Sequence, residues 1–190
     1  MAASQRPIVV GITGASGAIY GVRLLEALRA LAIESHLVLT EPAEITLRQE
    51  TDFTPEATRA LASHAHDPRN LAAPIASGSF ATGGMIVAPC SIKTLSAVAT
   101  SHADNLLVRA ADVTLKEGRP LLLVVRETPL HLGHLRLMAR AAENGAIIFP
   151  PVPAFYSRPR TIDQLVNQSV GRMLARLGID NALYETWEGV

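Results

Sequence analysis

The stretch Ile8-Val-Val-Gly-Ile-Thr-Gly-Ala-Ser-Gly17 joins a short β-branched run to a glycine-rich turn, and an apolar-periodic segment follows over residues 18–32. This order predicts a buried strand, a tight turn and a helix. The backbone N–H groups of such a turn, with the N-terminus of the helix, can hold an anion. Thr13 or Ser16 can add a hydroxyl, so we expect a phosphate there. The alternative is a structural turn in which Ser16 only caps the helix.

Short apolar runs alternate with helical patterns along the rest of the chain. We expect strands over residues 8–12, 36–39, 85–88, 121–125 and 146–149. We expect helices over residues 18–32, 43–49, 93–100, 105–117, 130–144 and 161–177. This alternation predicts an α/β fold in which helices cover both faces of a parallel sheet. We expect the polar segment 51–70 to be an exposed excursion with one short helix, and residues 1–190 to form a single domain.

The composition favours an oligomer and disfavours several partners. Charged residues make up 18% of the chain, against roughly 25% in typical soluble domains, so we expect a homo-oligomer that buries much of its surface. The net charge is +0, and no overall field draws the chain to nucleic acid or to a membrane surface. Cys90 is the single cysteine, which excludes an intrachain disulfide and a cysteine-rich zinc site. Residues 1–7 lack the apolar core of a signal peptide, and we expect a cytoplasmic protein.

Polar residues follow the expected strands at their carboxyl ends, where parallel sheets bind ligands. These segments are 13–17, Thr40-Glu41, Pro89-Cys-Ser91, Arg126-Glu127 and Pro150-Pro151. The segment Ser91-Ile-Lys-Thr94 opens a helix and offers hydroxyls and N–H groups beside the first glycine-rich turn. Two such turns side by side suit a mononucleotide, although capping alone would explain Ser91.

Arg109, Asp112 and Lys116 are three and four residues apart, which places them along one face of a helix. Such a face is most often a solvated row of ion pairs. Arg126-Glu127, however, ends the next buried strand and must project from the carboxyl edge of the sheet. A cationic pocket with one carboxylate is therefore a second interpretation, in which cations hold a phosphate leaving group and the carboxyl group moves protons.

The C-terminal part of the chain contains four of the eight aromatic residues. Tyr156 and Arg172 offer a phenol and a guanidinium to a ligand. Phe155 and Trp187, in the alternative interpretation, are packing or interface anchors.

Two histidine pairs, His64-x-His66 and His131-x-x-His134, have spacings that occur in metal sites. Neither pair has a third convincing ligand. We therefore expect structural or exposed histidines and no metal.

The spacing of glycines 11, 14 and 17 also occurs in short-chain dehydrogenases, which makes a nicotinamide enzyme a rival interpretation. Such an enzyme would need a Tyr-x-x-x-Lys pair. The fourth residues after Tyr20, Tyr156 and Tyr184 are leucine, arginine and glutamate. The sequence therefore lacks the catalytic pair that a short-chain dehydrogenase needs.

Several motifs occur together in a characteristic order. They are Thr13-Gly-Ala-Ser-Gly17, Ser77-Gly-Ser79, Pro89-Cys-Ser91, Arg109-Ala-Ala-Asp-Val113, Leu115-Lys-Glu117, Arg126-Glu127, Pro153-Ala-Phe-Tyr156 and Gly171-Arg172. On these motifs the sequence resembles the UbiX family of flavin prenyltransferases along nearly its whole length. The resemblance implies a flavodoxin-like Rossmann fold, a three-layer sandwich with a parallel central sheet. It also implies metal-independent chemistry and dodecamers whose sites lie at subunit junctions.

The resemblance further implies an activity, substrates and partners. Members of the family join the dimethylallyl group of dimethylallyl phosphate to N5 and C6 of reduced FMN. The product is prenylated FMN, which UbiD-type decarboxylases use, and a flavin reductase supplies the reduced flavin.

Position by position, the resemblance assigns residues to each ligand. The residues placed on FMN are Gly14, Ala15, Ser16, Thr40, Ser91, Ile92, Lys93, Thr94 and Arg126. Those placed on the prenyl substrate are Arg109, Lys116, Tyr156, Arg172 and Trp187. Those placed around the reacting centre as catalytic residues are Ser16, Glu50, Arg109, Lys116 and Glu127. Thr40 stands where relatives can have serine, and Phe80 stands where some relatives have a smaller residue.

In the mechanism we expect, Arg109, Lys116, Tyr156 and Arg172 neutralise the departing phosphate while the electron-rich flavin captures the dimethylallyl carbon. Glu127 relays a proton for ring closure, with Ser16 or Glu50 assisting. Two other functions remain open at this point. One is an FMN-dependent cysteine decarboxylase of the phosphopantothenoylcysteine type, and the other is a non-catalytic FMN carrier.

Overall fold

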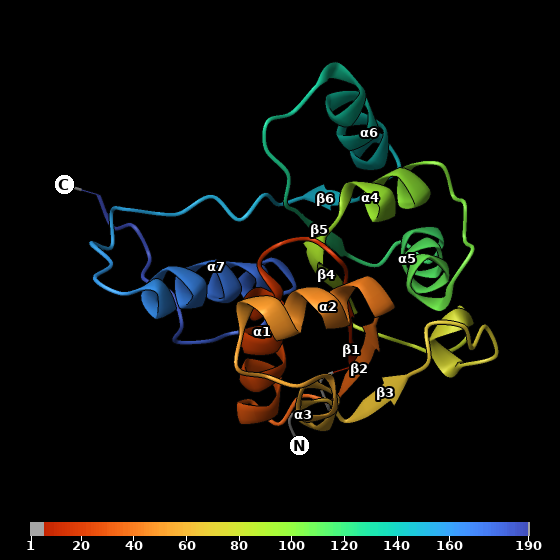
Figure 1. The fold of residues 1–190 in the computed structure, drawn as a ribbon, viewed down its shortest axis with the longest axis horizontal. Coiled ribbons are helices and arrows are strands. Elements are labelled where there is room, and N and C mark those ends of the chain that lie inside the picture. The colour runs from red at the N-terminus through yellow and green to blue at the C-terminus, as the bar shows by residue number, and fades with distance from the viewer. Residues whose placement is uncertain (1–5, 190) are drawn as a thin grey trace.

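The computed structural model describes residues 6–189. Six strands alternate with helices along the chain (Figure 1). The strands are β1 (Ile8–Ile12), β2 (Ser35–Leu39), β3 (His64–His66), β4 (Gly84–Cys90), β5 (Leu121–Val125) and β6 (Ile147–Ile148). The helices are α1 (Ala18–Ala30), α2 (Glu41–Glu50), α3 (Pro55–Leu61), the 3-10 turn η1 (Pro74–Ala76), α4 (Ile92–Ala99), α5 (Leu106–Lys116), α6 (Leu132–Glu143) and α7 (Ile162–Arg176).

All six strands are parallel and form one sheet in the order β3-β2-β1-β4-β5-β6. The five strands other than the short edge strand β3 follow the flavodoxin-like order, in which the first strand is central and the chain reverses direction beside it. The reversal lies between β1 and β4, where Ile8 is in register with both Ser35 and Gly84. The predicted flavodoxin-like α/β fold with a parallel sheet is confirmed.

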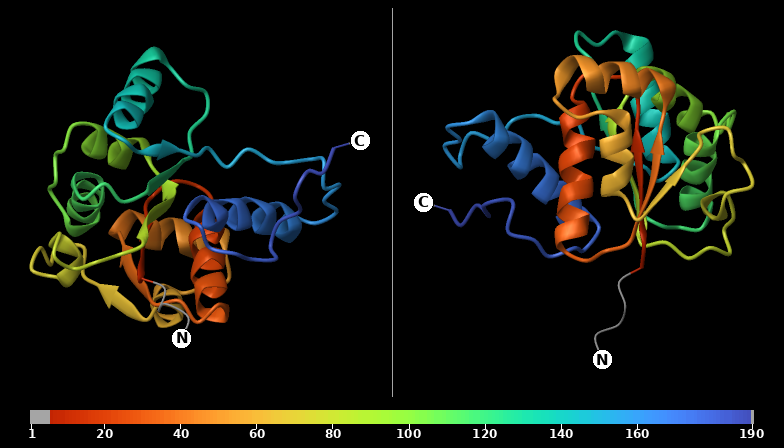
Figure 2. Two further views of the ribbon diagram at one scale, coloured as in Figure 1. Left: turned by 180° about the vertical axis from the view of Figure 1, so that it is seen from behind. Right: turned by 60° about the horizontal axis from the view of Figure 1, so that its bottom comes forward.

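Helices cover both faces of this sheet (Figure 2). Alternate residues of β1 explain why, because Ile8, Val10 and Ile12 join the core under α1 and α7, whereas Val9 joins the core under α4 and α5. A strand whose two faces are both buried must be apolar at every position, as the opening sequence is. Gly21 lets α1 approach closely, since a Cβ there would lie 2.5 Å from the carbonyl oxygen of Ala88.

The chain differs from the sequence-based expectation most clearly in the segment 51–70. It contains the expected short helix, α3, but also the edge strand β3, which was not expected. The strand has the sequence His-Ala-His and joins the sheet through backbone pairing with β2, in which His36 is in register with His64. Without an apolar run, such a strand carries no hydrophobic signal. β4 also continues through Pro89 to Cys90, beyond the expected end at residue 88.

Two segments flank α7 and form an extension that we call the C-terminal arm, residues 150–161 and 180–189. The outer part of α7 and the arm project from one side of the molecule (Figure 1). The arm leaves large apolar side chains in solvent, with Phe155 72% and Trp187 58% exposed. Within residues 6–189, none of the helices has the length and apolar character needed to cross a membrane.

Candidate functional site

A cavity of about 260 Å³ lies at the carboxyl ends of β1, β2 and β4. This is the position where the direction of winding reverses and where open parallel sheets bind ligands. Its lining consists of Thr13, Gly14, Thr40, Pro42, Pro68, Ser91, Lys93, Thr94, Ala97, Asp104, Asn105 and Val108. We call this the nucleotide cavity. Five of the residues predicted to bind FMN therefore surround one space, namely Gly14, Thr40, Ser91, Lys93 and Thr94.

Thr13 holds the two turns of the nucleotide cavity together. Its buried hydroxyl donates to the carbonyl oxygen of Pro89 at 2.8 Å and accepts from the backbone N–H of Ser91, also at 2.8 Å. Thr40 is tied to the same edge, because its hydroxyl donates to the carbonyl oxygen of Ile12 at 3.2 Å. These bonds fix the β1, β2 and β4 ends relative to one another within a single chain.

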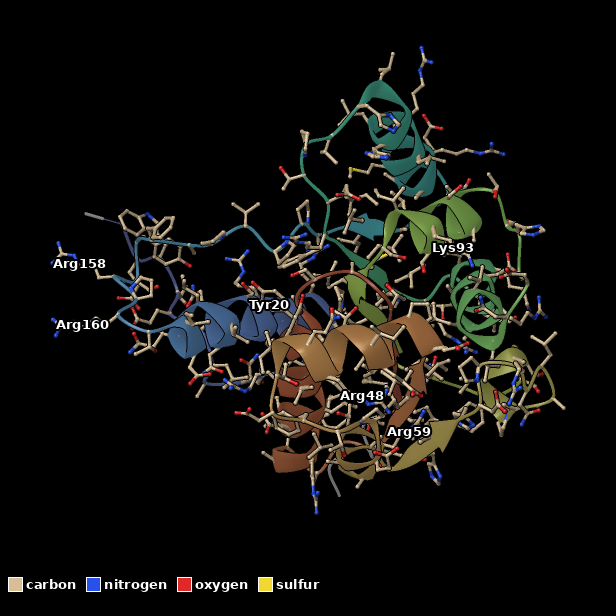
Figure 3. The ribbon with its side chains drawn as sticks, viewed as in Figure 1. Tyr20, Arg48, Arg59, Lys93, Arg158 and Arg160 are labelled. Carbon is tan, nitrogen blue, oxygen red and sulfur yellow. The ribbon has the colours of Figure 1, made fainter. Side chains whose placement is uncertain are left out.

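Ser91 is the N-cap of α4, since its Oγ accepts from the backbone N–H of Thr94 at 3.3 Å. The capping interpretation of Ser91 is therefore correct, and the same residue also lines the nucleotide cavity. Lys93 lies on the first turn of α4 (Figure 3). A cationic side chain and the free N–H groups of a helix start both favour an anion at this end of the cavity.

The first glycine-rich turn is arranged differently from the prediction. Ser16 does not cap α1; Gly17 is the N-cap, with a φ of +100° that favours glycine. The carboxylate of Glu50, at the end of α2, accepts hydrogen bonds from the backbone N–H groups of Gly17 at 2.7 Å and Ala18 at 3.2 Å. The start of α1 thus binds a carboxylate of the protein itself in this structure, and the phosphate expected at this turn stays a prediction. The pairing also brings Glu50 to the turn that contains Ser16.

Four predicted FMN contacts lie beside the nucleotide cavity rather than on it. In the structure of residues 6–189, the lining does not include Ala15, Ser16, Ile92 or Arg126. Arg126 is the first residue after β5, and its backbone N–H donates to the carbonyl oxygen of Cys90 at 3.1 Å. Its charge acts on Tyr20, which lies on α1 close to α7 (Figure 3). Burial raises the pKa of this tyrosine above its usual value, while Ser169 and the Arg126 charge act in the opposite direction.

The predicted cations of α5 form a row along the loop that contains η1. Arg109 donates to the carbonyl oxygen of Ala76 at 3.2 Å and to the Asp112 carboxylate at 3.0 Å. Lys116 pairs with Glu117, and this lysine holds the pKa of Glu117 below its usual value. The ion-pair face predicted from the spacing is therefore present, whereas the cationic pocket stays a prediction.

Arg119 is a residue that the sequence analysis missed. Its guanidinium donates to the carbonyl oxygens of Gly78 at 2.7 Å and Phe80 at 2.8 Å, and so fastens the loop over α5. The signal available in the sequence was its position three residues after Lys116, just beyond the helix.

The predicted substrate residues of the C-terminal part form a second cluster. The Tyr156 hydroxyl donates to the carbonyl oxygen of Glu185 at 3.1 Å and accepts from the side chain of Gln168 at 2.7 Å. The rings of Tyr156 and Trp187 meet edge to face at 5.8 Å. Arg172 lies with its guanidinium carbon 5.8 Å from the centre of the Tyr184 ring.

The α5 row and the C-terminal cluster lie on opposite sides of the sheet. Helix α5 packs into the core on one face and α7 into the core on the other, and the two helices lie far apart in both views of Figure 2. One chain therefore does not bring Arg109 and Lys116 together with Tyr156 and Arg172. Glu127 lies exposed at the end of β5, where its carboxylate accepts from the backbone N–H of Thr128 at 3.0 Å.

A larger hollow of about 620 Å³ adjoins the nucleotide cavity between α2, α3 and β3. Its lining includes Glu41, Glu44 and Asp67, and its two arginines are already paired, Arg59 with Glu44 and Arg69 with Asp67. Arg48 and Arg59 lie on the α2 side of the molecule (Figure 3). The hollow thus has one more carboxylate than arginines, which disfavours a phosphate there.

Comparison with known proteins assigns the chain to a family. The model of the flavoprotein family matches residues 2–173. The flavin prenyltransferase UbiX of Escherichia coli is 58% identical over 97% of this chain and 100% of its own length. The chain belongs to the UbiX family of flavin prenyltransferases.

Two solved structures of UbiX relatives have nearly the same fold. AnUbiX (PadA1), crystallised in complex with FMN and dimethylallyl pyrophosphate, superposes with a TM-score of 0.96 and 51% identity, covering 98% of this chain and 99% of that chain. A dodecameric FMN-dependent UbiX-like decarboxylase from Escherichia coli gives a TM-score of 0.94 and 46% identity, with coverage of 96% and 100%. The family predicted from the ordered motifs is confirmed.

Proposed function

We propose that the protein joins the dimethylallyl group of dimethylallyl phosphate to N5 and C6 of reduced FMN, and that prenylated FMN then passes to a UbiD-type decarboxylase. The observation that carries the proposal is the nucleotide cavity, where four hydroxyl side chains and one lysine converge at the carboxyl edge of the sheet in a member of this family. A flavin reductase supplies the reduced flavin. The proposal includes a cytoplasmic location, because a reducing compartment helps to keep the flavin reduced.

The lining of the nucleotide cavity fits the phosphate end of a mononucleotide. The Thr94 hydroxyl accepts from Ser91 and can donate to a phosphate, while the Thr40 hydroxyl donates to the carbonyl oxygen of Ile12. Lys93 provides a positive charge at the start of α4. The cavity volume of about 260 Å³ is below the roughly 300–1,000 Å³ of most small-molecule sites. One chain therefore encloses part of the ligand, and we infer that the rest lies against a second copy.

The cations on α5 are suited to a phosphate leaving group. Arg109 and Lys116 each have a carboxylate partner at present, in Asp112 and Glu117, so each is held in position before a substrate arrives. When bound, reduced flavin supplies an electron-rich carbon and nitrogen that accept the allylic group. A contact to charge that develops in the transition state contributes on the order of 3–4 kcal/mol.

Tyr156 and Arg172 reach this phosphate from a neighbouring subunit in our proposal. They lie on the opposite side of the sheet from Arg109 in their own chain, and the C-terminal arm beside them exposes Phe155 and Trp187. An exposed apolar arm that projects from the molecule is suited to packing against another copy. We propose a homododecamer with its sites at the junctions. Trp187 then contributes to the prenyl pocket and excludes water.

Proton transfer is assigned to residues at the carboxyl edge of the sheet. Glu127 is exposed at the end of β5 and can relay a proton during ring closure. Ser16 and Glu50 assist, because the Glu50 carboxylate is fixed by two backbone N–H groups at the turn that contains Ser16.

The activity is tested by mixing the protein anaerobically with reduced FMN and either dimethylallyl phosphate or the pyrophosphate. We expect a flavin heavier by one prenyl unit in the mass spectrum, and unchanged flavin with both esters would overturn the proposal. Glu127→Gln should bind both ligands but convert them slowly, whereas a non-catalytic carrier would be unaffected by this change. Turnover of a cysteine-containing substrate in place of prenyl transfer would favour the decarboxylase alternative.

The position of FMN is tested by a pair of helix caps. Ser91→Ala removes the cap of α4 in the nucleotide cavity, and Thr54→Ala removes the cap of α3, where Thr54 accepts from the backbone N–H of Ala57 at 3.1 Å. Each loses about 1 kcal/mol of stability. In a fluorescence titration only Ser91→Ala should weaken FMN binding, by roughly five- to tenfold, since one hydrogen bond contributes about 1 kcal/mol. Equal affinities in the two variants would exclude FMN from this cavity.

A further inference from the structure

A cluster of three histidines and one glutamate lies at the β2–β3 edge of the sheet, away from the nucleotide cavity. His36 and His64 are register partners on the adjacent strands, and His66 lies two residues further along β3 on the same face. Glu34 precedes β2 directly. His36 is four residues before Thr40, about 13 Å along an extended strand, so the cluster is a separate feature from the flavin site.

The distances between side-chain atoms in this cluster match those between ligands on a zinc ion. Glu34 Oε1 lies 3.1 Å from His36 Nε2 and 3.2 Å from His64 Nε2. Tetrahedral zinc with ligands at about 2.0–2.1 Å requires ligand atoms about 3.3 Å apart. The carboxylate oxygen therefore lies at about the required spacing from each imidazole nitrogen, and all three ligand atoms lie within 4.8 Å of one another.

The surroundings of His36 resemble the support that metal-binding histidines usually have. Its second nitrogen, Nδ1, lies 2.9 Å from Nε2 of His66. In the tautomer that carries its proton on Nδ1, this nitrogen donates to His66 and the lone pair of Nε2 points towards Glu34 and His64. Such an outer hydrogen bond fixes the tautomer of a metal ligand. Phe80 packs edge-on against the His36 ring at 5.1 Å and shields it from solvent.

We propose that Glu34, His36 and His64 bind one Zn²⁺ ion, with a fourth position open to water. The His36 side chain is 4% exposed, while those of Glu34 and His64 are 48% and 56% exposed, so an ion can enter from solvent and complete its shell with water. The sequence analysis expected no metal because Glu34 and His36, the two other proposed ligands, are not near His64 along the chain. Strand pairing brings it there.

The role that follows is structural and independent of the flavin reaction. β3 has only three residues and lies at the edge of the sheet, where a short strand is held by few backbone bonds. An ion shared between Glu34, β2 and β3 would fasten this edge. Its binding free energy would add to the stability of the folded chain.

The experiment uses tag-free, chelator-treated protein in its native assembly. Competition with a chromophoric zinc chelator should give one Zn²⁺ per chain, and Co²⁺ should produce the visible absorption of a four-coordinate site. At free zinc a hundredfold above the dissociation constant, the Tm should rise by roughly 5–10 °C. These readouts do not involve prenyl transfer, so their failure is distinct from failure of the proposed function.

Matched variants decide which residues bind the ion. His64→Ala and Glu34→Gln change exposed side chains and should abolish the stoichiometric binding and the rise in Tm. His131→Ala changes the other histidine pair, whose rings are 3.6 Å apart, and should leave both unchanged. Circular dichroism of the zinc-free variants checks their folding. Absence of binding in the parent protein, or binding that survives both His64→Ala and Glu34→Gln, would overturn the proposal.

Discussion

The carboxyl edge of the sheet and the C-terminal arm contribute to the proposed site in opposite ways. At the sheet edge, the buried Thr13 connects β1 to β4 by two hydrogen bonds of 2.8 Å within one chain. In the arm, Phe155 is 72% exposed and Trp187 58% exposed. The hydrogen bonds of the first region are complete within a single chain, whereas the second has apolar surface that a monomer leaves in water. In the proposed site, one chain therefore holds the phosphate end of the nucleotide by itself, and assembly completes the prenyl phosphate end.

The largest effect should come from substituting the two arginines of the proposed prenyl phosphate site, Arg109 on α5 and Arg172 on α7. Arg109→Ala and Arg172→Ala should each lower kcat/KM by roughly 100- to 1,000-fold, because each removes a cation from the leaving phosphate. If the two arginines come from different subunits, co-assembled mixtures of the two inactive variants regain activity, at about a quarter of the sites in an equal mixture. Steady-state assays of refolded mixtures measure this. Mixtures as inactive as their components would show that one subunit supplies both arginines.

Thr13→Val should have the next largest effect, and on stability. The change removes a hydroxyl that both donates and accepts in a buried position, and unpaired buried groups cost about 1–3 kcal/mol. Urea denaturation of the dissociated chain measures the loss. Thr114→Val is the matched control, because this buried hydroxyl donates only to the helical carbonyl oxygen of Ala110. A loss of FMN affinity in Thr13→Val alone would confirm that Thr13 shapes the nucleotide cavity.

Phe155→Ala tests whether the C-terminal arm contributes to assembly and not to the stability of the dissociated chain. The side chain is largely exposed in one chain, so its loss should leave the denaturation of the dissociated chain unchanged. If it packs against another copy, assembly should weaken by about 2 kcal/mol per contact. Sedimentation at decreasing protein concentration detects this. Leu71→Ala, which is 52% exposed elsewhere, should not change assembly, and an equal response of the two variants would refute an interface role for the arm.

The smallest effect on activity is expected at Cys90, beside the nucleotide cavity. Burial raises the pKa of this thiol to about 12, so it stays protonated and enclosed at neutral pH and cannot serve as a nucleophile. Cys90→Ala should keep prenyl transfer within about twofold and lose about 1 kcal/mol of stability. A hundredfold loss of activity in mass-spectrometric assays would contradict this.

Cys90 should also contribute to the pH dependence of stability. The folded chain holds the thiol proton to a higher pH than the unfolded chain, whose thiol has the ordinary pKa of 9.0. This contribution is complete below pH 9 and is lost as the pH rises towards 12. The free energy of unfolding of the parent protein should therefore fall more steeply with pH in this interval than that of Cys90→Ala. Parallel slopes in urea titrations would contradict the assignment.

Strong local signals made most of the fold predictable. The strand Leu121–Val125 has the expected bounds because five consecutive apolar residues have no other favourable place than a sheet buried on both faces. β3 was missed because His-Ala-His carries no such signal and depends on backbone pairing with β2. For the same reason, Glu34 and His36 could not be recognised as partners of His64 from spacing along the chain.

The candidate site was predictable where its residues follow strand ends. Thr40, Ser91, Lys93 and Thr94 line the nucleotide cavity because parallel strands bring their carboxyl ends to one edge. The carboxylate that binds the N-terminus of α1 was not predictable, since Glu50 lies 33 residues away from Gly17 in the sequence. Only packing of α2 beside the turn places that carboxylate there.

By itself the sequence determined the parallel α/β architecture, the family and the residue types at each strand end, because apolar periodicity and ordered motifs are local properties. The tertiary structure decided which of those residues meet. It placed the α5 cations and the Tyr156–Arg172 cluster on opposite faces of the sheet, and it brought Glu34 to two histidines on neighbouring strands. Distances between residues remote in sequence depend on how helices and strands pack, which a local sequence pattern does not predict.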